Sequence, residues 1–493
     1  MIHYQSTRGS EHYKSGAKAV IQGIAEDGGL YVPSSVPPLP FDVEDMIGKS
    51  YKEIALPVLQ AFFGDYTTEE LQACVDGAYD SKFDAPDIVP VVKAEDAYFM
   101  ELYHGKTAAF KDMALSIMPL LLTTALKKEK EDKSICILTA TSGDTGKAAL
   151  AGYEDLPGTE IIVFYPKDGV SEVQEQQMVT QTGSNTHVVS IRGNFDDAQT
   201  GVKKIFDDGA FNTELAEAGY KLSSANSINI GRLVPQVAYY VYGYIKLLEQ
   251  GAINTGEAVN VVVPTGNFGN ILAAYYAAKM GIPVNKFICA SNENNVLTDF
   301  IQTGTYDLHR DFELTTSPSM DILISSNLER LLYHLSGDMG EEIAAYMQSL
   351  KTDKEYTVSD TIKAGLQKFY GGYATMDRVE ELIGNMFEKH GYLMDTHTAV
   401  GYRVYKDYIE KTGDKTPALL ASTASAYKFA EAVGRALGLP AEQDGFACIE
   451  AVNKKTGVPV PEGLKDLKNK PVLHDKTVDI ADMEAAVRQA LGK

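Results

Sequence analysis

One lysine occupies a position that disfavours a positive charge. Lys111, in the stretch Ala109-Phe110-Lys111-Asp112, lies at the start of a long helix that we predict to run to about residue 130. The N-terminal end of a helix carries a partial positive charge, which repels an ammonium group. Burial and positive potential lower the pKa of an amine, and a neutral amine can form an imine with a carbonyl. A solvated surface lysine is the alternative interpretation of this residue taken alone.

A turn rich in hydroxyl groups follows the predicted buried strand SICILTA. It comprises residues 139–146, TATSGDTG, and leads directly into a helix. Backbone N–H groups at the start of a helix bind anions, so this turn could receive a carboxylate or a phosphate. Ser, Thr and Asp are also common helix N-caps, and capping alone is an equally good interpretation of this turn in isolation.

A second turn, residues 264–270 (PTGNFGN), follows the apolar strand VNVVV and precedes an apolar helix. No Gly-Lys-Ser/Thr follows it, so it is not a Walker loop. It also lacks the GxGxxG spacing of a dinucleotide-binding turn. Phosphate binding is favoured over a plain strand-to-helix turn, because two glycines allow a ligand to approach the backbone closely.

A third run of amide and hydroxyl side chains ends in an arginine. It comprises residues 223–232, SSANSINIGR. Arg232 could bind a phosphate through two parallel hydrogen bonds. A loop with an exposed arginine is the alternative.

Taken together, phosphate-binding turns and a lysine at a disfavoured position predict a pyridoxal-phosphate site. The elements that would position them alternate between strand and helix from about residue 95 onward, including EIIVFYP, THVVSIRG, KFICAS and PALLAST as strands. This alternation predicts a parallel sheet covered by helices on both faces. In such sheets ligands bind at the carboxyl ends of the strands, where the turns described above lie.

The pattern changes along the chain predict three regions. Residues 1–95 are expected to form a small, mainly helical domain. Residues 96–430 form the catalytic region: residues 134–235 make a small α/β subdomain, and residues 96–133 with 236–430 make a large one that includes a helical insertion at about 305–400. Residues 431–493 are expected to be a C-terminal extension that packs on the large subdomain.

Composition excludes several classes of protein. The 493 residues carry a formal net charge of −22, which argues against nucleic-acid binding. No stretch is apolar over the ~18 residues that a membrane helix needs, and the N-terminal residues lack the apolar core of a signal peptide. The four scattered cysteines (Cys74, Cys136, Cys289 and Cys448) have no CxxC spacing, so we expect reduced thiols, a cytoplasmic location and no metal site.

Several motifs in the same order match a known family. They are GLYVP, ELYHGKTAAFKD, TATSGDTGKAA, SANSINIGR, VVPTGNFGN, SPSMDILISSNLERLL, DTHTAVGYR and STASAYKF. With them the chain resembles threonine synthase, a family of fold type II pyridoxal-phosphate enzymes. The resemblance implies two three-layer α/β domains with parallel sheets and a small helical N-terminal domain.

The resemblance also implies a role for each matching residue. Lys111 would form the Schiff base with the cofactor. The turn that would hold the cofactor phosphate consists of Gly266, Asn267, Phe268, Gly269 and Asn270. Thr423 would face the pyridine nitrogen, and Asp144 would lie near the ring hydroxyl. The substrate carboxylate would meet Thr141, Ser142, Gly143 and Thr145, and the substrate phosphate would meet Asn226, Ser227 and Arg232.

Two residues depart from the motifs of the family. Lys106 stands where the family commonly has proline, and Ser425 where it commonly has histidine. Lys106 could add positive charge near the phosphate or point to solvent, and the sequence leaves both open. His104 and His397 lie in matching motifs, where a core or hydrogen-bonding role is favoured over catalysis.

The activity implied by the resemblance is a β,γ-replacement. O-phospho-L-homoserine, a small-molecule substrate, and water would give L-threonine and phosphate. The predicted two-domain architecture adds the hypothesis that one domain closes over this substrate. The alternatives are a related phospho-lyase or a serine/threonine dehydratase, either of which gives a 2-oxo acid, and a non-catalytic binding protein with the same fold. The resemblance favours a monomer and leaves a dimer open.

Overall fold

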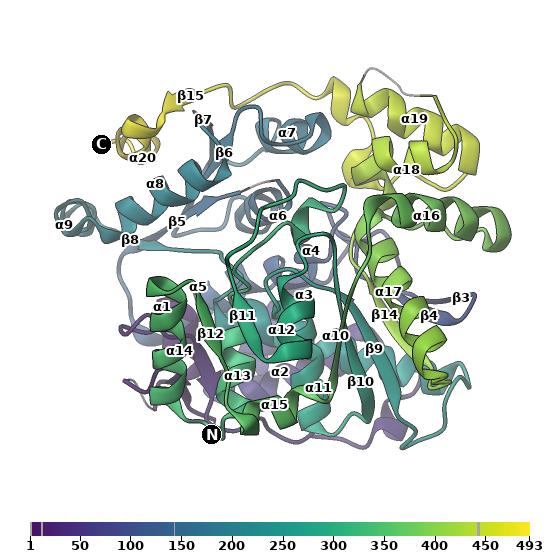
Figure 1. The fold of residues 1–493 in the computed structure, drawn as a ribbon. Helices are drawn as coiled ribbons and strands as arrows, with labels where there is room; N and C mark the ends of the chain where they lie inside the picture. The colour runs from purple at the N-terminus through teal and green to yellow at the C-terminus, as the bar shows by residue number, and fades with distance from the viewer. Residues whose placement is uncertain (1, 11–12, 142, 441–443) are drawn as a thin grey trace.

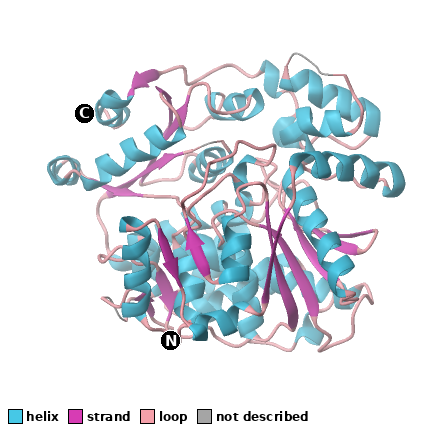
Figure 2. Cartoon of the chain, in the orientation of Figure 1, coloured by secondary structure: helices cyan, strands magenta, loops and turns pink. Residues whose placement is uncertain are grey.

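Two sheets covered by helices make up most of the molecule. The computed structural model describes residues 2–10, 13–141, 143–440 and 444–493. The larger sheet lies in the lower half of Figure 1 and the smaller one in the upper left, and Figure 2 shows helices on both sides of the strands. The predicted α/β fold with largely parallel sheets is confirmed.

The larger sheet has six strands, and all its neighbouring pairs except β4–β3 are parallel. In spatial order the strands are β13 (Phe369–Tyr373), β10 (Val284–Ser291), β9 (Val259–Pro264), β14 (Ala418–Ser422), β4 (Ala97–Glu101) and β3 (Val91–Ala94). Every residue of β9 and β14 is buried. Their nearly continuous apolar sequences fit central strands that are covered on both faces.

Long helices cover the larger sheet. α17 (Thr396–Thr412) packs across β9, β10 and β14, while α12 (Val296–Thr303) packs on β10 and β13. α10 (Ile230–Glu249) packs against α11 (Gly269–Met280). α10 is almost wholly buried because other helices cover it on more than one side.

The smaller sheet has five parallel strands. In spatial order they are β15 (Thr477–Asp479), β7 (Thr186–Arg192), β6 (Thr159–Pro166), β5 (Ser134–Ala140) and β8 (Tyr220–Ser223). Its helices are α6 (Asp144–Tyr153), α7 (Glu172–Val179), α8 (Phe195–Asp207) and α9 (Gly209–Glu217). This unit corresponds in sequence to the predicted small subdomain, except for β15.

The six-stranded sheet and the helices that cover it form the larger unit of the molecule. The N-terminal region is mainly helical and shares its core with this larger unit. A short antiparallel pair, β1 (Tyr4–Ser6) and β2 (Tyr31–Pro33), accompanies the helices α1 (Gly16–Gln22), α2 (Tyr51–Phe62) and α3 (Thr68–Ala78). Capping boxes formed by Ser50 with Glu53 and by Thr67 with Glu70 begin α2 and α3. α2 packs on α10, and side chains of both helices belong to one hydrophobic cluster.

The segment expected to be a helical insertion also contributes strands. It contains the helices α13 (Leu328–Leu335), α14 (Gly340–Thr352), α15 (Asp360–Leu366) and α16 (Met376–His390), with the short turn η2 (Pro318–Met320). β11 (Thr305–Asp307) pairs with β12 (Glu355–Thr357), and β13 forms an edge of the larger sheet. The segment is therefore part of the sheet architecture as well as a helical cover.

The C-terminal region spans both units. After the short turn η3 (Ala426–Phe429), the helices α18 (Ala430–Ala436) and α19 (Gly445–Thr456) pack on each other, and α18 contacts α16. The chain then passes through the turns η4 (Glu462–Leu464) and η5 (Leu467–Asn469) and crosses the top of the molecule in Figure 1. There β15 pairs with β7, and after η6 (Ile480–Asp482) the helix α20 (Met483–Ala490) packs on α8. The prediction that residues 431–493 pack on the large subdomain is wrong for this last part, because a three-residue strand leaves no periodic pattern to read.

The long helix predicted after Lys111 is broken in two. α4 (Lys111–Leu115) ends before α5 (Met118–Glu129), whose first turn contains Pro119. Proline has no N–H to donate to the carbonyl group four residues earlier, here that of Leu115. α6 approaches α4 at this break, and a Cβ atom on Gly152 would lie 2.0 Å from the Leu115 carbonyl oxygen.

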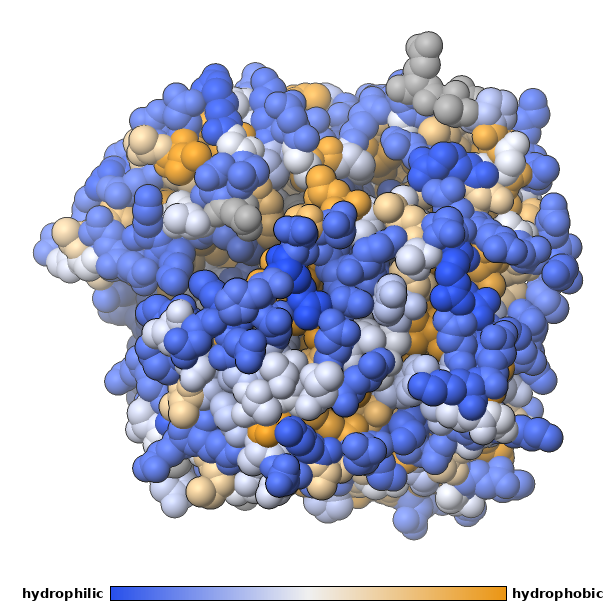
Figure 3. Space-filling model, viewed as in Figure 1, coloured by the Kyte–Doolittle hydropathy of each residue, from blue (hydrophilic) through white to orange (hydrophobic). Residues whose placement is uncertain are grey.

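The surface of the molecule is mostly hydrophilic, and its cysteines lie in the interior. Hydrophilic residues dominate the face shown in Figure 3, and hydrophobic ones form small patches. Cys74, Cys136, Cys289 and Cys448 are free and buried. Among the described helices, none has the length and apolar character needed to cross a bilayer.

Replacing Gly152 with alanine should destabilise the protein by about 1–3 kcal/mol, because the added methyl group overlaps a backbone carbonyl that cannot rotate away. Urea unfolding would measure the change in the free energy of unfolding. Gly209→Ala is the matched control, since that glycine also lies in a helix and a Cβ there meets no atom within 4 Å. Equal stability of the two variants would contradict the tight contact between α4 and α6.

Candidate active site

Lys111 is the first residue of α4 and is held between the two units. Its Nζ atom donates to Ser319 Oγ at 3.1 Å and lies 3.6 Å from Asp144 Oδ2. The side chain is 11% exposed. Burial lowers the pKa of the Lys111 amine, Asp144 opposes this, and the positive charges of Lys428 and Arg232 lower it further. The net shift is downward, which favours a neutral, nucleophilic amine.

The segment before Lys111 is joined to the end of β14. Phe110 N donates to Thr423 O at 2.8 Å, and Ser425 N donates to Ala108 O at 3.0 Å. Thr423 itself is buried. The structure thus brings Thr423 and Lys111, predicted from distant parts of the sequence, into adjacent segments.

The turn after β5 is organised by one hydroxyl group. Thr141 Oγ1 accepts hydrogen bonds from the N–H groups of Gly143, at 3.0 Å, and Gly146, at 2.9 Å. Gly143 has a φ of +136°, a conformation that a residue with a side chain rarely adopts. Thr145 is half-buried, and the predicted residue Ser142 lies outside the described residues.

Asp144 begins α6 and is buried between two lysines. Its Oδ1 atom lies 2.8 Å from Lys428 Nζ and accepts from Gln174 Nε2 at 3.0 Å, while Oδ2 faces Lys111. Burial raises the pKa of this carboxyl, but Lys428, Lys111 and Gln174 together hold it well below its ordinary value. Asp144 is therefore a carboxylate at neutral pH.

The glycine turn after β9 is tied to the segment that bonds Lys111. Phe268 adopts a left-handed conformation at the start of α11, and Gly266 O accepts from Ser325 Oγ at 2.7 Å. Asn267 O accepts from both N and Nδ2 of Asn327, each at 3.0 Å. A Cβ atom on Gly266 would lie 2.5 Å from Ser319 O, so only glycine allows this approach.

A buried donor in this turn fits an anionic ligand. Asn270, in the first turn of α11, accepts from the Tyr240 hydroxyl through Oδ1, whereas its buried Nδ2 finds no hydrogen-bond partner among the described residues. Gly269 is the first residue of α11, where backbone N–H groups lack partners within the helix. Free donors at a helix N-terminus fit a phosphate group.

The third predicted run lies beside the other two. Arg232 is buried at the start of α10 and donates from Nη1 to Ala225 O at 2.7 Å, but its Nε has no partner within the described part of the chain. Burial lowers the pKa of Arg232 to about 10, which leaves it a cation at neutral pH.

Two long-range contacts connect the three runs. The exposed Asn226 accepts from Thr139 Oγ1 at 3.4 Å, and Ser227 O accepts from Asn327 Nδ2 at 3.2 Å. Since Asn327 also donates to Asn267 O, hydrogen bonds connect all three turns.

Three residues of this site were missed from the sequence: Ser319, Gln174 and Lys428. None lies in a turn that follows a strand directly, and Lys428 sits in the otherwise apolar stretch AYKF. His397 supports Ser319, whose N–H donates to Nε2 at 3.1 Å, while Nδ1 lies 2.8 Å from Asp395 Oδ2. The hydrogen-bonding role expected for His397 fits this geometry.

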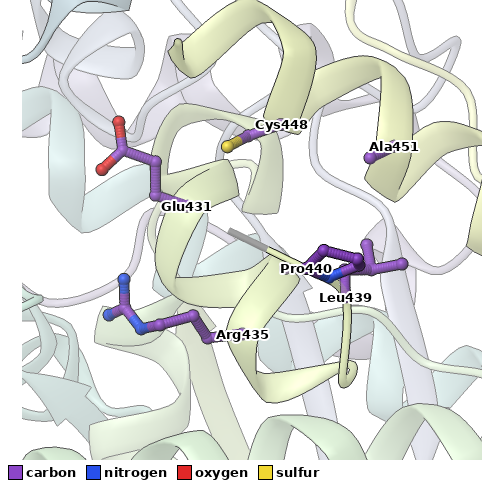
Figure 4. A pocket seen from close by; sticks show the side chains of 7 residues that line it. Glu431, Arg435, Leu439, Pro440, Cys448 and Ala451 are labelled. Carbon is purple, nitrogen blue, oxygen red and sulfur yellow. The ribbon is translucent and has the colours of Figure 1, made fainter. Parts of the chain in front are cut away.

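Lys106 does not point toward the predicted phosphate turns. Its Nζ lies 2.9 Å from Glu154 Oε2, and the side chain is half-exposed at the rim of a cavity of about 160 Å³ between α3, α4 and α6. A second cavity, of about 110 Å³, lies between α18 and α19 (Figure 4). No predicted site residue within the described ranges lines that second cavity.

Comparisons with known proteins show the family to which the chain belongs. Three family descriptions match: "Threonine synthase N terminus" over residues 3–79, "Pyridoxal-phosphate dependent enzyme" over 83–421 and "Threonine synthase, C-terminal" over 398–491. Threonine synthase from Schizosaccharomyces pombe is 35% identical, and the alignment covers 94% of this chain and 97% of that protein. Human threonine synthase-like 1 is 40% identical over 85% of this chain, which spans only 58% of that protein.

A solved structure is similar over the whole length. The pyridoxal-phosphate-bound threonine synthase from Brucella melitensis superimposes with a TM-score of 0.88 at 34% identity, and the match covers 100% of both chains. The fold, the cofactor class and the sequence motifs therefore all indicate the same family.

The hydroxyl of Thr141 should be essential for the shape of the turn after β5. In Thr141→Val the side chain keeps its shape, but the buried N–H groups of Gly143 and Gly146 lose their acceptor, and the free energy of unfolding should fall by about 1–3 kcal/mol. Thr145→Val is the control, because that half-buried hydroxyl organises no such pair. A loss at both positions alike would count against this account of the turn.

Proposed function

The chain belongs to the threonine synthase family of pyridoxal-phosphate-dependent enzymes, and on that basis we propose that it converts O-phospho-L-homoserine and water to L-threonine and phosphate. The observation that carries the proposal is the Lys111 amine: it is buried, weakly paired and adjacent to turns with unused donors. Free buried thiols fit a cytoplasmic location for this reaction.

The residues of the site fit the cofactor. Lys111 would hold it covalently, and Asp144 and Thr423 would contact its ring. Its phosphate would bind at the turn formed by Gly266, Asn267, Phe268, Gly269 and Asn270, where Asn270 Nδ2 has no partner among the described residues. Once bound, pyridoxal phosphate supplies an electron sink for negative charge that develops on the substrate.

The substrate would be held by two groups of donors. The carboxylate would bind in the turn that contains Thr141, Gly143 and Thr145, and the phosphate would bind near Asn226, Ser227 and Arg232. Local donors are needed because the formal net charge of −22 repels an anionic substrate at long range. The Lys111 amine, once released from the cofactor, would move protons at the α and β carbons of the substrate.

The first test is a product assay on the purified protein supplied with pyridoxal phosphate and O-phospho-L-homoserine. Phosphate and threonine should form in equal amounts, and Lys111→Ala should abolish both because the amine that handles the protons is gone. Lys106→Ala is a matched lysine control, since Lys106 pairs with Glu154 outside the site, and it should stay active.

Other products would select other functions. Phosphate together with 2-oxobutyrate would indicate a phospho-lyase, in which water addition fails. No phosphate release would exclude the proposed substrate and favour a dehydratase that acts on serine or threonine.

Arg232 should contribute mainly to substrate affinity. Removing its charge in Arg232→Gln should lower kcat/KM for O-phospho-L-homoserine by about 10–100-fold, the effect of losing hydrogen bonds to a charged group. The cofactor should still bind, as measured by visible absorbance. Arg192→Gln removes the charge of an exposed arginine on β7 and should leave kcat/KM unchanged. An unchanged kcat/KM in Arg232→Gln would remove this residue from the substrate site.

A further inference from the structure

A second lysine is buried next to the candidate catalytic amine. Lys428, in η3, is fully buried, whereas Lys111 retains some exposure to the site. Lys428 Nζ lies 2.8 Å from Asp144 Oδ1 and donates to Thr107 O at 2.8 Å and to Gln177 Oε1 at 3.2 Å. These three oxygens match the three N–H donors of an ammonium group, which has no acceptor of its own.

Asp144 therefore faces two lysines unequally. Its distance to Lys428 is 2.8 Å and its distance to Lys111 is 3.6 Å. Lys428 makes three close contacts to oxygens, whereas Lys111 makes one hydrogen bond within the described part of the chain, to the neutral hydroxyl of Ser319. The carboxylate is neutralised mainly by Lys428, so it stabilises a charge on Lys111 less than a lone carboxylate would.

We propose that Lys428 is a positioning residue that serves as the counter-ion of Asp144 and thereby leaves the Lys111 amine free to form the covalent link to the cofactor. This rests on the role proposed for Lys111. Lys428 also connects the two units, because Thr107 precedes α4 while Asp144 and Gln177 lie on α6 and α7 of the smaller unit. One ammonium group thus determines both the charge beside Lys111 and the placement of Asp144.

The charged groups that act on Lys111 predict the direction in which its pKa changes when Lys428 is replaced. Asp144 raises its pKa, and Lys428 and Arg232 lower it. Asp112 also faces Lys428, but it is bound by the backbone N–H and hydroxyl of Thr107, and burial raises its pKa. Removing the charge of Lys428 should therefore raise the pKa of Lys111, because a repulsive neighbour is lost and Asp144 is left with Lys111 as its remaining lysine partner.

The test is the pH dependence of cofactor attachment in the whole 493-residue chain after removal of its cofactor. The rate at which the visible imine band appears with pyridoxal phosphate follows the neutral fraction of the attacking amine. Lys428→Met should move the midpoint of this rate profile upward by about one to three pH units. Lys428→Arg, which keeps the charge, should stay near the wild-type midpoint. An unchanged midpoint in Lys428→Met would overturn the proposal.

Two further variants separate charge from folding and shape. Lys428→Gln removes the charge but retains donors for Asp144 and Thr107, so it gives the same test if Lys428→Met does not fold. In the double variant Lys428→Met with Asp144→Asn no carboxylate remains to hold the Lys111 ammonium, and the midpoint should return toward that of the wild type. Persistence of the shift in the double variant would mean that shape, not charge, is responsible, and would overturn the proposal.

Mapping the attached lysine keeps this inference separate from the proposed function. Borohydride reduction followed by peptide analysis should locate the cofactor on Lys111 in the wild type. Attachment at Lys111 without a shift in Lys428→Met contradicts only the role of Lys428. Attachment at Lys428 would overturn both this role and the assignment of Lys111.

Discussion

A lysine amine attacks a carbonyl only when it is neutral, and this requirement constrains the whole site. The amine of Lys111 is desolvated where α4 begins, next to a carboxylate that alone would favour its protonation. Lys428, at the other carboxylate oxygen of Asp144, gives that carboxylate a closer partner. The site thereby retains the buried Asp144 carboxylate, and this carboxylate does not hold Lys111 in its protonated form.

The contacts around Asp144 depend on the larger and the smaller unit keeping their positions relative to each other. Asp144 and Gln177 come from the smaller unit, whereas Lys111, Thr107 and Lys428 come from the larger one. The units meet where Gly152 on α6 contacts the carbonyl of Leu115, at the end of the short helix that starts with Lys111. The C-terminal chain adds a second connection, because it runs from α18 to β15 on the smaller sheet (Figure 1). A movement of one unit against the other would alter the Lys428–Asp144 contact and with it the environment of Lys111.

The side of the site that we propose to bind phosphate groups relies on unpaired donors instead of paired charges. There the chain leaves buried donors without protein partners, namely Nε of Arg232 and Nδ2 of Asn270 within the described residues. Leaving a buried donor unpaired costs about 1–3 kcal/mol, and an anionic ligand that accepts from it recovers this cost. In a protein with a net charge of −22, such local donors provide the attraction that the overall field does not.

The turns could be predicted because their chemistry is local. Small residues at 139–146 and 264–270 follow apolar strands, and the carboxyl ends of parallel strands share one edge of a sheet. By the same reasoning the α/β class was readable from alternating strands and helices, and the motifs around Lys111 from their order along the chain. The break of the helix at Pro119 was also visible in the sequence, although the pattern of apolar residues ran across it.

The sequence by itself thus determined the strand-to-helix turns, the class of fold and the lysine that we propose to hold the cofactor, since each depends on residues close together in the chain. Only the tertiary structure decided that Lys428 would neutralise Asp144, that Ser319 would meet Lys111 and that β15 would join the smaller sheet. Those contacts join residues far apart in the chain. Their geometry depends on how the packed units orient their side chains, which no local pattern of residue types records.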